Sequence, residues 1–172
     1  MAGSLVKIQE TTVTSAVASV DLGGSSWNSS YDVYLVRLNN VNTSADCSIL
    51  FRFLVSSSPD TSANYDKAQL NLRGDGAFSD SGAVNQTSIN LGSIGTGTQE
   101  QSNGIIYIYN ANDSSEYSFI TTEMSTRNNE SHLRGFQGGG VLTVAQATNG
   151  VSIINDSGNF TSGTFTLYGF KK

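Results

Sequence analysis

The chain has 172 residues, of which 37% are hydrophobic and 13% charged, so it is long enough for one folded domain and lacks the composition of a disordered chain. Its formal net charge is −5 and its few Lys and Arg residues are scattered, which argues against a nucleic-acid backbone or an anionic membrane surface as partner. The longest apolar segment is too short to cross a bilayer and no secretory signal is visible, so we expect a soluble protein made in a cytoplasm.

Alternation of apolar and polar residues predicts about ten short strands, and no segment has helical periodicity. Residues 73–86 are polar and rich in glycine, which predicts a loop or a pair of turns, and the three glycines at 138–140 predict a hairpin or a bulge. In chain order the expected strands cover residues 5–9, 13–22, 31–38, 47–55, 65–72, 87–94, 104–109, 117–124, 132–136, 141–147, 151–154 and 164–170.

Two expected strands, over residues 31–38 and 104–109, are apolar on both faces. An antiparallel sheet with one face in water alternates instead. The second face of these strands is therefore covered by loops of the same chain, or it meets another subunit, which would make the protein an oligomer. The pattern as a whole predicts an all-β, antiparallel, single-domain fold over residues 1–172, either a sandwich or a barrel.

The sequence contains few side chains that could act in catalysis or bind a metal. Cys47 and His132 are the only cysteine and the only histidine, so neither a disulfide nor a closed zinc site can form within the chain. No serine lies in the Gly-x-Ser-x-Gly pattern of a nucleophile elbow. We therefore expect no enzyme activity, no metal and no cofactor, and we expect Cys47 to be a small buried hydrophobic residue.

Two short motifs have both a functional and a structural interpretation. The oxygen-rich segment 110–116 could bind calcium, but it lacks the EF-hand pattern and is also typical of a turn. Arg73-Gly74-Asp75 spells an integrin-binding tripeptide, but it also suits a glycine-containing turn after a strand. We favour the structural interpretation of both.

Several segments together resemble a known family. They are ETTVTSAVASVDL followed by YDVYLVRLNNV, then FRFLVSSS, ANYDKAQLNLRGDG, IYIYNANDSSEYSFITTEMS and the terminal SGTFTLYGFKK. Their order resembles a group of bacteriophage virion proteins found in marine and cyanobacterial phages, and the likeness covers nearly the whole chain. The resemblance implies a β-sandwich of jelly-roll type, made in the bacterial host and incorporated in the virion.

Within that family the compact chain fits a capsid decoration (cement) protein that stabilises the head by binding the major capsid protein or other virion proteins. The chain lacks a separate attachment domain and a repetitive shaft, which departs from tail-fibre architecture. The alternative is a tail-fibre, tail-tip or receptor-binding module whose partner is a carbohydrate. A homo-oligomer in the assembled particle is expected in either case.

The interface is expected at two places. A short N-terminal arm of about ten residues, with Leu5, Val6 and Ile8, could add to the sheet of a partner, and we expect its deletion through Gln9 to weaken attachment more than folding. Exposed aromatic side chains form the second place, because they suit both protein and sugar partners. The aromatic candidates are Trp27, first suspect for a sugar, with Tyr31 and Tyr34.

Overall fold

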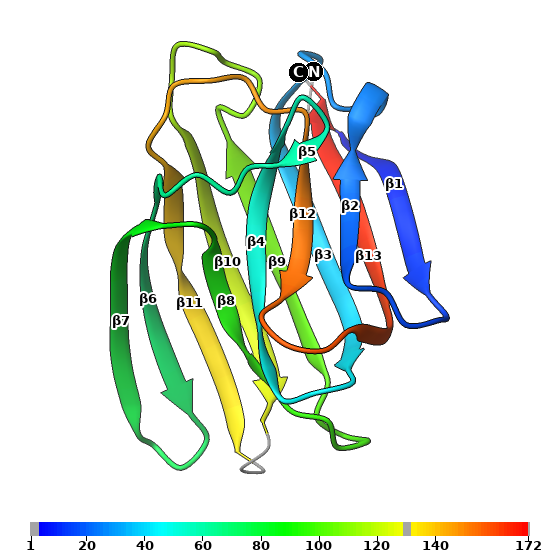
Figure 1. Ribbon diagram of the computed structural model, residues 1–172, viewed down its shortest axis with the longest axis vertical. Coiled ribbons are helices and arrows are strands. Elements are labelled where there is room, and N and C mark those ends of the chain that lie inside the picture. Colours follow the sequence, from blue (N-terminus) through cyan, green and yellow to red (C-terminus); the bar gives the residue numbers. More distant parts are fainter. Residues whose placement is uncertain (1–3, 129–131, 172) are drawn as a thin grey trace.

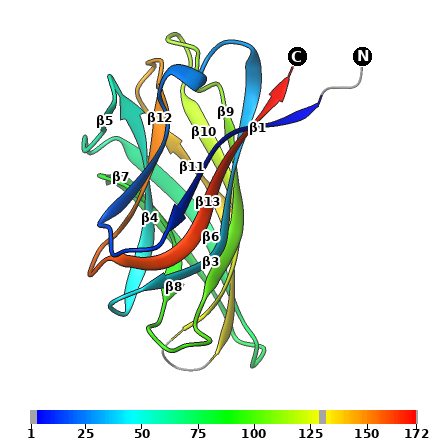
Figure 2. The same cartoon turned by 90° about the vertical axis from the view of Figure 1, so that its right-hand side faces the viewer.

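The computed structural model describes residues 4–128 and 132–171 and consists of two packed antiparallel sheets (Figures 1 and 2). The expected all-β sandwich is confirmed. The only helical segment in the described part of the chain is the 3-10 turn η1, Gly24–Ser26. No helix in these residues is long and apolar enough to span a membrane.

The larger sheet has eight strands in the order β1-β13-β3-β9-β10-β11-β6-β7, so strands from both ends of the chain lie side by side. All neighbouring pairs are antiparallel. The strands are β1 Leu5–Val13, β3 Tyr31–Thr43, β6 Tyr65–Arg73, β7 Phe78–Gln86, β9 Ser102–Tyr109, β10 Ser118–Arg127, β11 Leu133–Leu142 and β13 Phe160–Lys171.

The smaller sheet has five strands. Strands β2, β12 and β4 lie side by side in that order, and both β5 and β8 pair with β4. It covers one side of the larger sheet, as Figure 2 shows. The strands are β2 Ser19–Gly23, β4 Cys47–Val55, β5 Ser58–Pro59, β8 Ile89–Ile94 and β12 Gly150–Asn155.

The connections are those of a jelly roll. In the larger sheet β1 pairs with β13 and β3 with β9, while in the smaller sheet β2 pairs with β12 and β4 with β8. Each sheet thus alternates early and late strands, as two nested Greek keys require. Strands β6 and β7, and then β10 and β11, are additions that widen the larger sheet beyond the smaller one (Figure 1).

The core lies between the sheets. Strand β4 matches its expected bounds, and its alternate residues Phe51 and Phe53 are fully buried, with ring centroids 4.9 Å apart. The carboxy-terminal strand contributes Phe165, which packs edge-on against Phe160 at 5.2 Å. Side chains alternate across a strand, so one set of alternate residues in a strand such as β4 faces the opposite sheet, and the apolar members of that set exclude water from the core.

The expected break at the glycine run is wrong. Strand β11 continues from Leu133 to Leu142 through Gly138 and its neighbours. A Cβ at Gly138 would overlap the backbone of Ala68, and one at Gly140 would lie 2.6 Å from the Ile89 side chain. Glycine is therefore needed because adjacent strands come close, and no turn occurs there.

The loop expected over residues 73–86 is also wrong, because β7 forms within it. All of β7 except Ala83 is exposed, since the smaller sheet does not reach this edge. With neither face buried, the strand has no apolar alternation for sequence reasoning to detect.

The expected N-terminal arm is in part a paired strand. Residues 5–10 belong to β1, where Leu5 pairs with Phe170 and Glu10 with Thr166. Residues 1–3 lie outside the described part of the chain. Deletion through Gln9 would consequently remove the first five of the nine residues of β1, which covers the edge of β13.

Candidate interaction face

The side of the larger sheet that points away from the smaller sheet is the candidate site, and we call it the outer face. Every strand that the structure describes belongs to one of the two sheets, so none remains to cover this side. Antiparallel register aligns its side chains in rows that cross the strands.

The first row is apolar across six adjacent strands. Its members are paired in register from β1 to β11, although they come from both ends and the middle of the chain. They are, in order, Leu5, Phe170, Val33, Tyr109, Phe119 and Val141.

The second and third rows continue the outer face. The second runs through Lys7, Tyr168, Leu35, Tyr107, Thr121, Gly139 and Ala68. The third runs through Glu10, Thr166, Arg37, Ile105, Glu123, Gln137 and Leu70.

Aromatic rings pack against one another on the outer face. The Tyr107 and Phe170 ring centroids are 6.2 Å apart across β3, and Tyr168 lies on the same strand as Phe170. Leu35, between Tyr168 and Tyr107 in register, is only 8% exposed although no strand lies above it. The row side chains therefore already exclude water from one another.

The exposed large hydrophobic side chains are concentrated on the larger sheet. Phe119 is 44% exposed and Leu5 is 50% exposed, both in the first row. All the others except Tyr117 also belong to strands of the larger sheet, and none belongs to the smaller sheet. The full set is Leu5, Leu70, Leu72, Phe78, Val84, Tyr117, Phe119 and Leu133.

The outward side of the smaller sheet differs from the outer face. Its adjacent strands place Asp21 opposite Ser152, and Ser152 opposite Arg52, in register. Of this row Asp21 is exposed, Arg52 is half-buried and Ser152 is fully buried, while the next row pairs half-buried Leu50 with Ile154. The exposed large hydrophobic side chains therefore make the larger sheet the candidate interaction side, because contiguous exposed apolar surface on a protein marks an interaction site.

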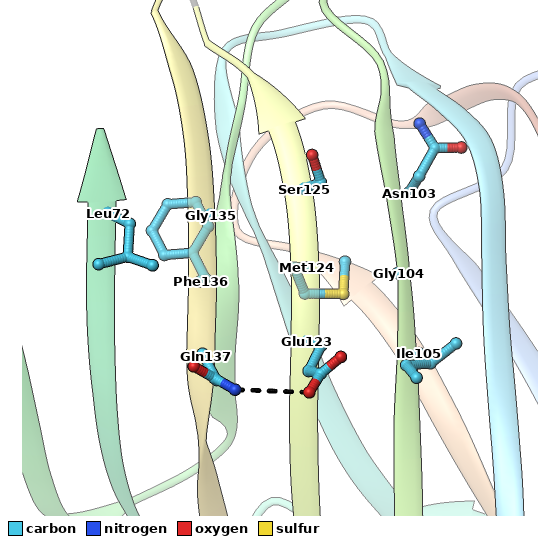
Figure 3. A pocket seen from close by; sticks show the side chains of 10 residues that line it. All are labelled: Leu72, Asn103, Gly104, Ile105, Glu123, Met124, Ser125, Gly135, Phe136 and Gln137. Atoms are coloured by element: carbon cyan, nitrogen blue, oxygen red, sulfur yellow. Dashed lines mark hydrogen bonds between the residues drawn. The ribbon is translucent and has the colours of Figure 1, made fainter. Parts of the chain in front are cut away.

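Three hollows indent the β10, β11, β6 and β7 half of the outer face. One of about 370 Å³ is lined by Ala68, Phe119, Gly139 and Val141, where glycine and alanine leave space between larger neighbours. A second, of about 470 Å³, is shown in Figure 3. There the Gln137 amide donates to the Glu123 carboxylate at 3.4 Å. The third, of about 490 Å³, lies toward β7.

Charges on the outer face are unevenly distributed. Lys7 and Arg37 lie on the β1 to β3 half, and Lys7 forms an ion pair with Glu10 at 3.5 Å. The pKa of Glu10 is lowered, first by the hydrogen bond that the Thr166 hydroxyl donates to it and then by Lys7. Among the described residues Arg37 has no acidic partner within 4 Å, and Glu123, on the other half, has no basic one.

The N-terminal interface candidates separate into two groups. Leu5 lies on the outer face, as the first residue of its apolar row. Val6, its neighbour in the strand, points to the opposite side, and Ile8 packs partly buried against the core at a bulge in β1. Only Leu5 is therefore placed on the outer face.

The aromatic candidates form a buried cluster, which corrects the expectation that Trp27 presents an exposed sugar platform. Trp27 is 6% exposed and stacks on Tyr34, with ring centroids 3.8 Å apart and planes at 5°. Tyr31 is half-buried and packs tilted against Tyr34 at 5.7 Å. These residues fix the loop before β3, and the rings of Trp27 and Tyr34 are too buried to present a face to a ligand.

The oxygen-rich segment 110–116 makes structural contacts. The Asn112 amide donates to the Tyr34 hydroxyl at 3.1 Å and to the Tyr31 carbonyl at 3.2 Å. Asp113 accepts from the Ser115 backbone at 2.8 Å, as in an Asx turn. Within the described residues no group of three His, Cys, Asp or Glu side chains could hold a metal ion.

The Arg-Gly-Asp tripeptide is folded back on itself at the end of β6. The Arg73 guanidinium donates to Asp75 at 2.7 Å and lies 3.4 Å from His132. Arg73 and Asp75 are thus engaged with each other. Cys47 is buried, which raises the pKa of its thiol and leaves it protonated at neutral pH, as its assignment to the core implies.

Sequence reasoning missed most of the outer face. Phe119, Tyr168 and Phe170 have no pattern in the sequence that marks them. The one available signal was the apolar character of both faces in residues 31–38 and 104–109, which become β3 and β9 at the centre of the outer face.

Comparison of the chain with protein-family models, with curated proteins and with solved structures finds no match.

Proposed function

We propose that the protein is a structural component of a bacteriophage virion, a capsid decoration protein that binds through its outer face. The family resemblance of the sequence supports the virion assignment. The jelly-roll connections agree with it, because this fold recurs in viral capsid domains. The binding mode needs no catalytic group, metal or cofactor.

The uncovered apolar row on the outer face carries the proposal. Leu5 and Phe119 are about half exposed, so burying the rest of either side chain contributes about 1 kcal/mol, and the row can supply part of a specific interface. Repetition over a particle makes moderate affinity per copy sufficient, because neighbouring contacts act together. The protein is made in the bacterial host and its partners are the major capsid protein or other virion proteins.

The test is the copy number in purified particles, measured by quantitative mass spectrometry against the major capsid protein. A copy number comparable to that of the major capsid protein is expected for decoration. A ratio far below it would overturn decoration in favour of a tail component. Absence from particles would overturn both virion assignments.

A tail-fibre or tail-tip module that binds carbohydrate is the second candidate. The aromatic residues Tyr107, Tyr109 and Phe119 of the outer face favour it, because sugars stack on exposed rings beside polar groups such as Glu123. A glycan array with the wild type and with Tyr107→Ala tests this role. Glycan binding that Tyr107→Ala abolishes would support it, and no binding by the wild type would exclude it for the glycans tested.

A further inference from the structure

The two halves of the outer face have complementary shapes. On the β13 and β3 side, the large side chains of Phe170 and Tyr168 stand on the sheet. On the β10 and β11 side, Gly139 leaves a hollow of about 370 Å³ at the level of the same row as Tyr168.

The charges of the two halves are complementary as well. Arg37 on β3 and Glu123 on β10 occupy the same row, one strand to either side of Ile105 on β9. Neither has an oppositely charged partner within 4 Å among the described residues. The outer face therefore carries a cation and an anion at equal distances from its central strand.

A two-fold axis along β9, in the plane of the outer face, brings these features together. It places β3 of one copy opposite β10 of another, and β13 opposite β11, without shifting the rows. Tyr168 then meets the hollow at Gly139, Arg37 meets Glu123, and both contacts occur twice. A two-fold interface requires this kind of self-complementary surface.

We propose that the occupant of the outer face is a second copy of this chain, packed sheet against sheet about this axis. The inference deepens the proposed function by naming the partner of the same face. The seven strands from β1 to β6, about 4.8 Å apart, and three residue rows about 6.8 Å apart span roughly 700 Å², which is close to the roughly 800 Å² that each partner buries in a standard interface. On the particle, the outer face then joins copies of this chain to one another, so loss of this contact should also weaken incorporation.

Charge reversal tests the pairing. Sedimentation equilibrium of the full chain should show a dimer for the wild type, while Arg37→Glu and Glu123→Arg should each weaken the dimer roughly tenfold or more, because like charges then face each other. An equimolar mixture of the two variants should regain wild-type affinity as a heterodimer, since both facing pairs are again of opposite charge.

Two further variants complete the test. Asp21→Arg, on the outward side of the smaller sheet, should leave the dimer unchanged. Ala68→Trp should fill the hollow and weaken the dimer in a chain that circular dichroism shows to be folded. A monomeric wild type, or a mixture that associates no better than its two components, would overturn the inference.

The outcomes separate this inference from the proposed function. A monomer in solution that is abundant on purified particles would refute the dimer and keep the decoration role. A dimer that is absent from particles would keep the dimer and refute the decoration role.

Discussion

Tyr34 joins three segments at one end of the sandwich. Its hydroxyl donates to the Asn28 carbonyl at 2.8 Å and accepts from the Asn28 backbone at 2.9 Å and from the Asn112 amide at 3.1 Å. Its ring is fully buried and stacked on Trp27. A buried hydroxyl with several partners fixes loop positions that packing alone leaves free.

The variant Tyr34→Phe should lower the free energy of unfolding by about 1–3 kcal/mol, because it leaves buried partners unsatisfied. Urea denaturation measures the change. Tyr107→Phe is the matched control, since the Tyr107 hydroxyl has no hydrogen-bond partner among the described residues, and it should change stability by less than about 0.5 kcal/mol. Equal effects of the two variants would contradict a role for the network.

Three buried groups that can lose a proton, one thiol and two tyrosine hydroxyls, predict how stability depends on pH. Burial raises the pKa of Cys47, Tyr34 and Tyr65 in the folded chain. Above about pH 8.5–10, the ordinary range of thiols and phenols, the unfolded chain therefore loses protons that the folded chain keeps. Stability is complete below that range and should fall as pH rises through it.

The free energy of unfolding, measured by denaturation from neutral to alkaline pH, tests whether stability falls as predicted. Cys47→Ala should remove the thiol contribution and retain the later tyrosine contribution, so its stability should begin to fall at a higher pH than that of the wild type. A wild-type stability that stays constant or rises at alkaline pH would show that these groups do not control it.

Strand β11 depends on glycine because β6 and β10 approach it closely. A Cβ on Gly138 would overlap the Ala68 carbonyl oxygen and the Gln69 Cα, whereas one on Gly82 in β7 would meet only the Lys67 carbonyl at 3.8 Å. Gly138→Ala should therefore destabilise the chain by about 1–3 kcal/mol, while Gly82→Ala should be neutral or stabilising by about 0.5 kcal/mol. Thermal unfolding compares them, and equal shifts would argue against close strand approach as the reason for glycine.

Strand β7 should be the most easily opened strand of the larger sheet. It is an edge strand with both faces in contact with water, while β3 is paired on both sides and largely buried. Hydrogen exchange followed by mass spectrometry should show β7 amides exchanging well before those of β3. Protection of β7 equal to that of β3 would mean that a partner covers this edge in solution.

For individual strands, the sequence predicts the element only where one face of the strand is more buried than the other. Strand β4 was predicted with its observed bounds because its phenylalanines all point inward. Strand β7 was missed because neither face is buried, and Gly138 was assigned to a hairpin or a bulge because β6, which crowds it, is distant in sequence.

The same reasoning explains how much of the site was predictable. Residues 31–38 and 104–109 predicted an apolar second face, and the structure places them as β3 and β9 at its centre. The rows that include Phe119 and Phe170 depend on register between distant strands, which no local pattern encodes. Trp27 was misassigned because nothing in its polar segment shows that Tyr34 stacks on it.

At the scale of the whole molecule, the larger sheet has two different sides. One side forms the core with the smaller sheet, and the outer face presents Leu5, Phe119 and other apolar side chains to solvent. Conversely, the smaller sheet shows a polar surface at Asp21 and Arg52. This asymmetry is the reason why we propose the outer face as the binding surface.

The occupancy of purified phage particles by two variants tests that assignment most directly. Phe119→Glu places a charge in the apolar row, and Asp21→Arg places one on the opposite side of the molecule. Competed against the wild type for the same particles, Phe119→Glu should be largely excluded, while Asp21→Arg should be incorporated as well as the wild type. Equal incorporation of Phe119→Glu would show that the outer face does not hold the protein in its particle.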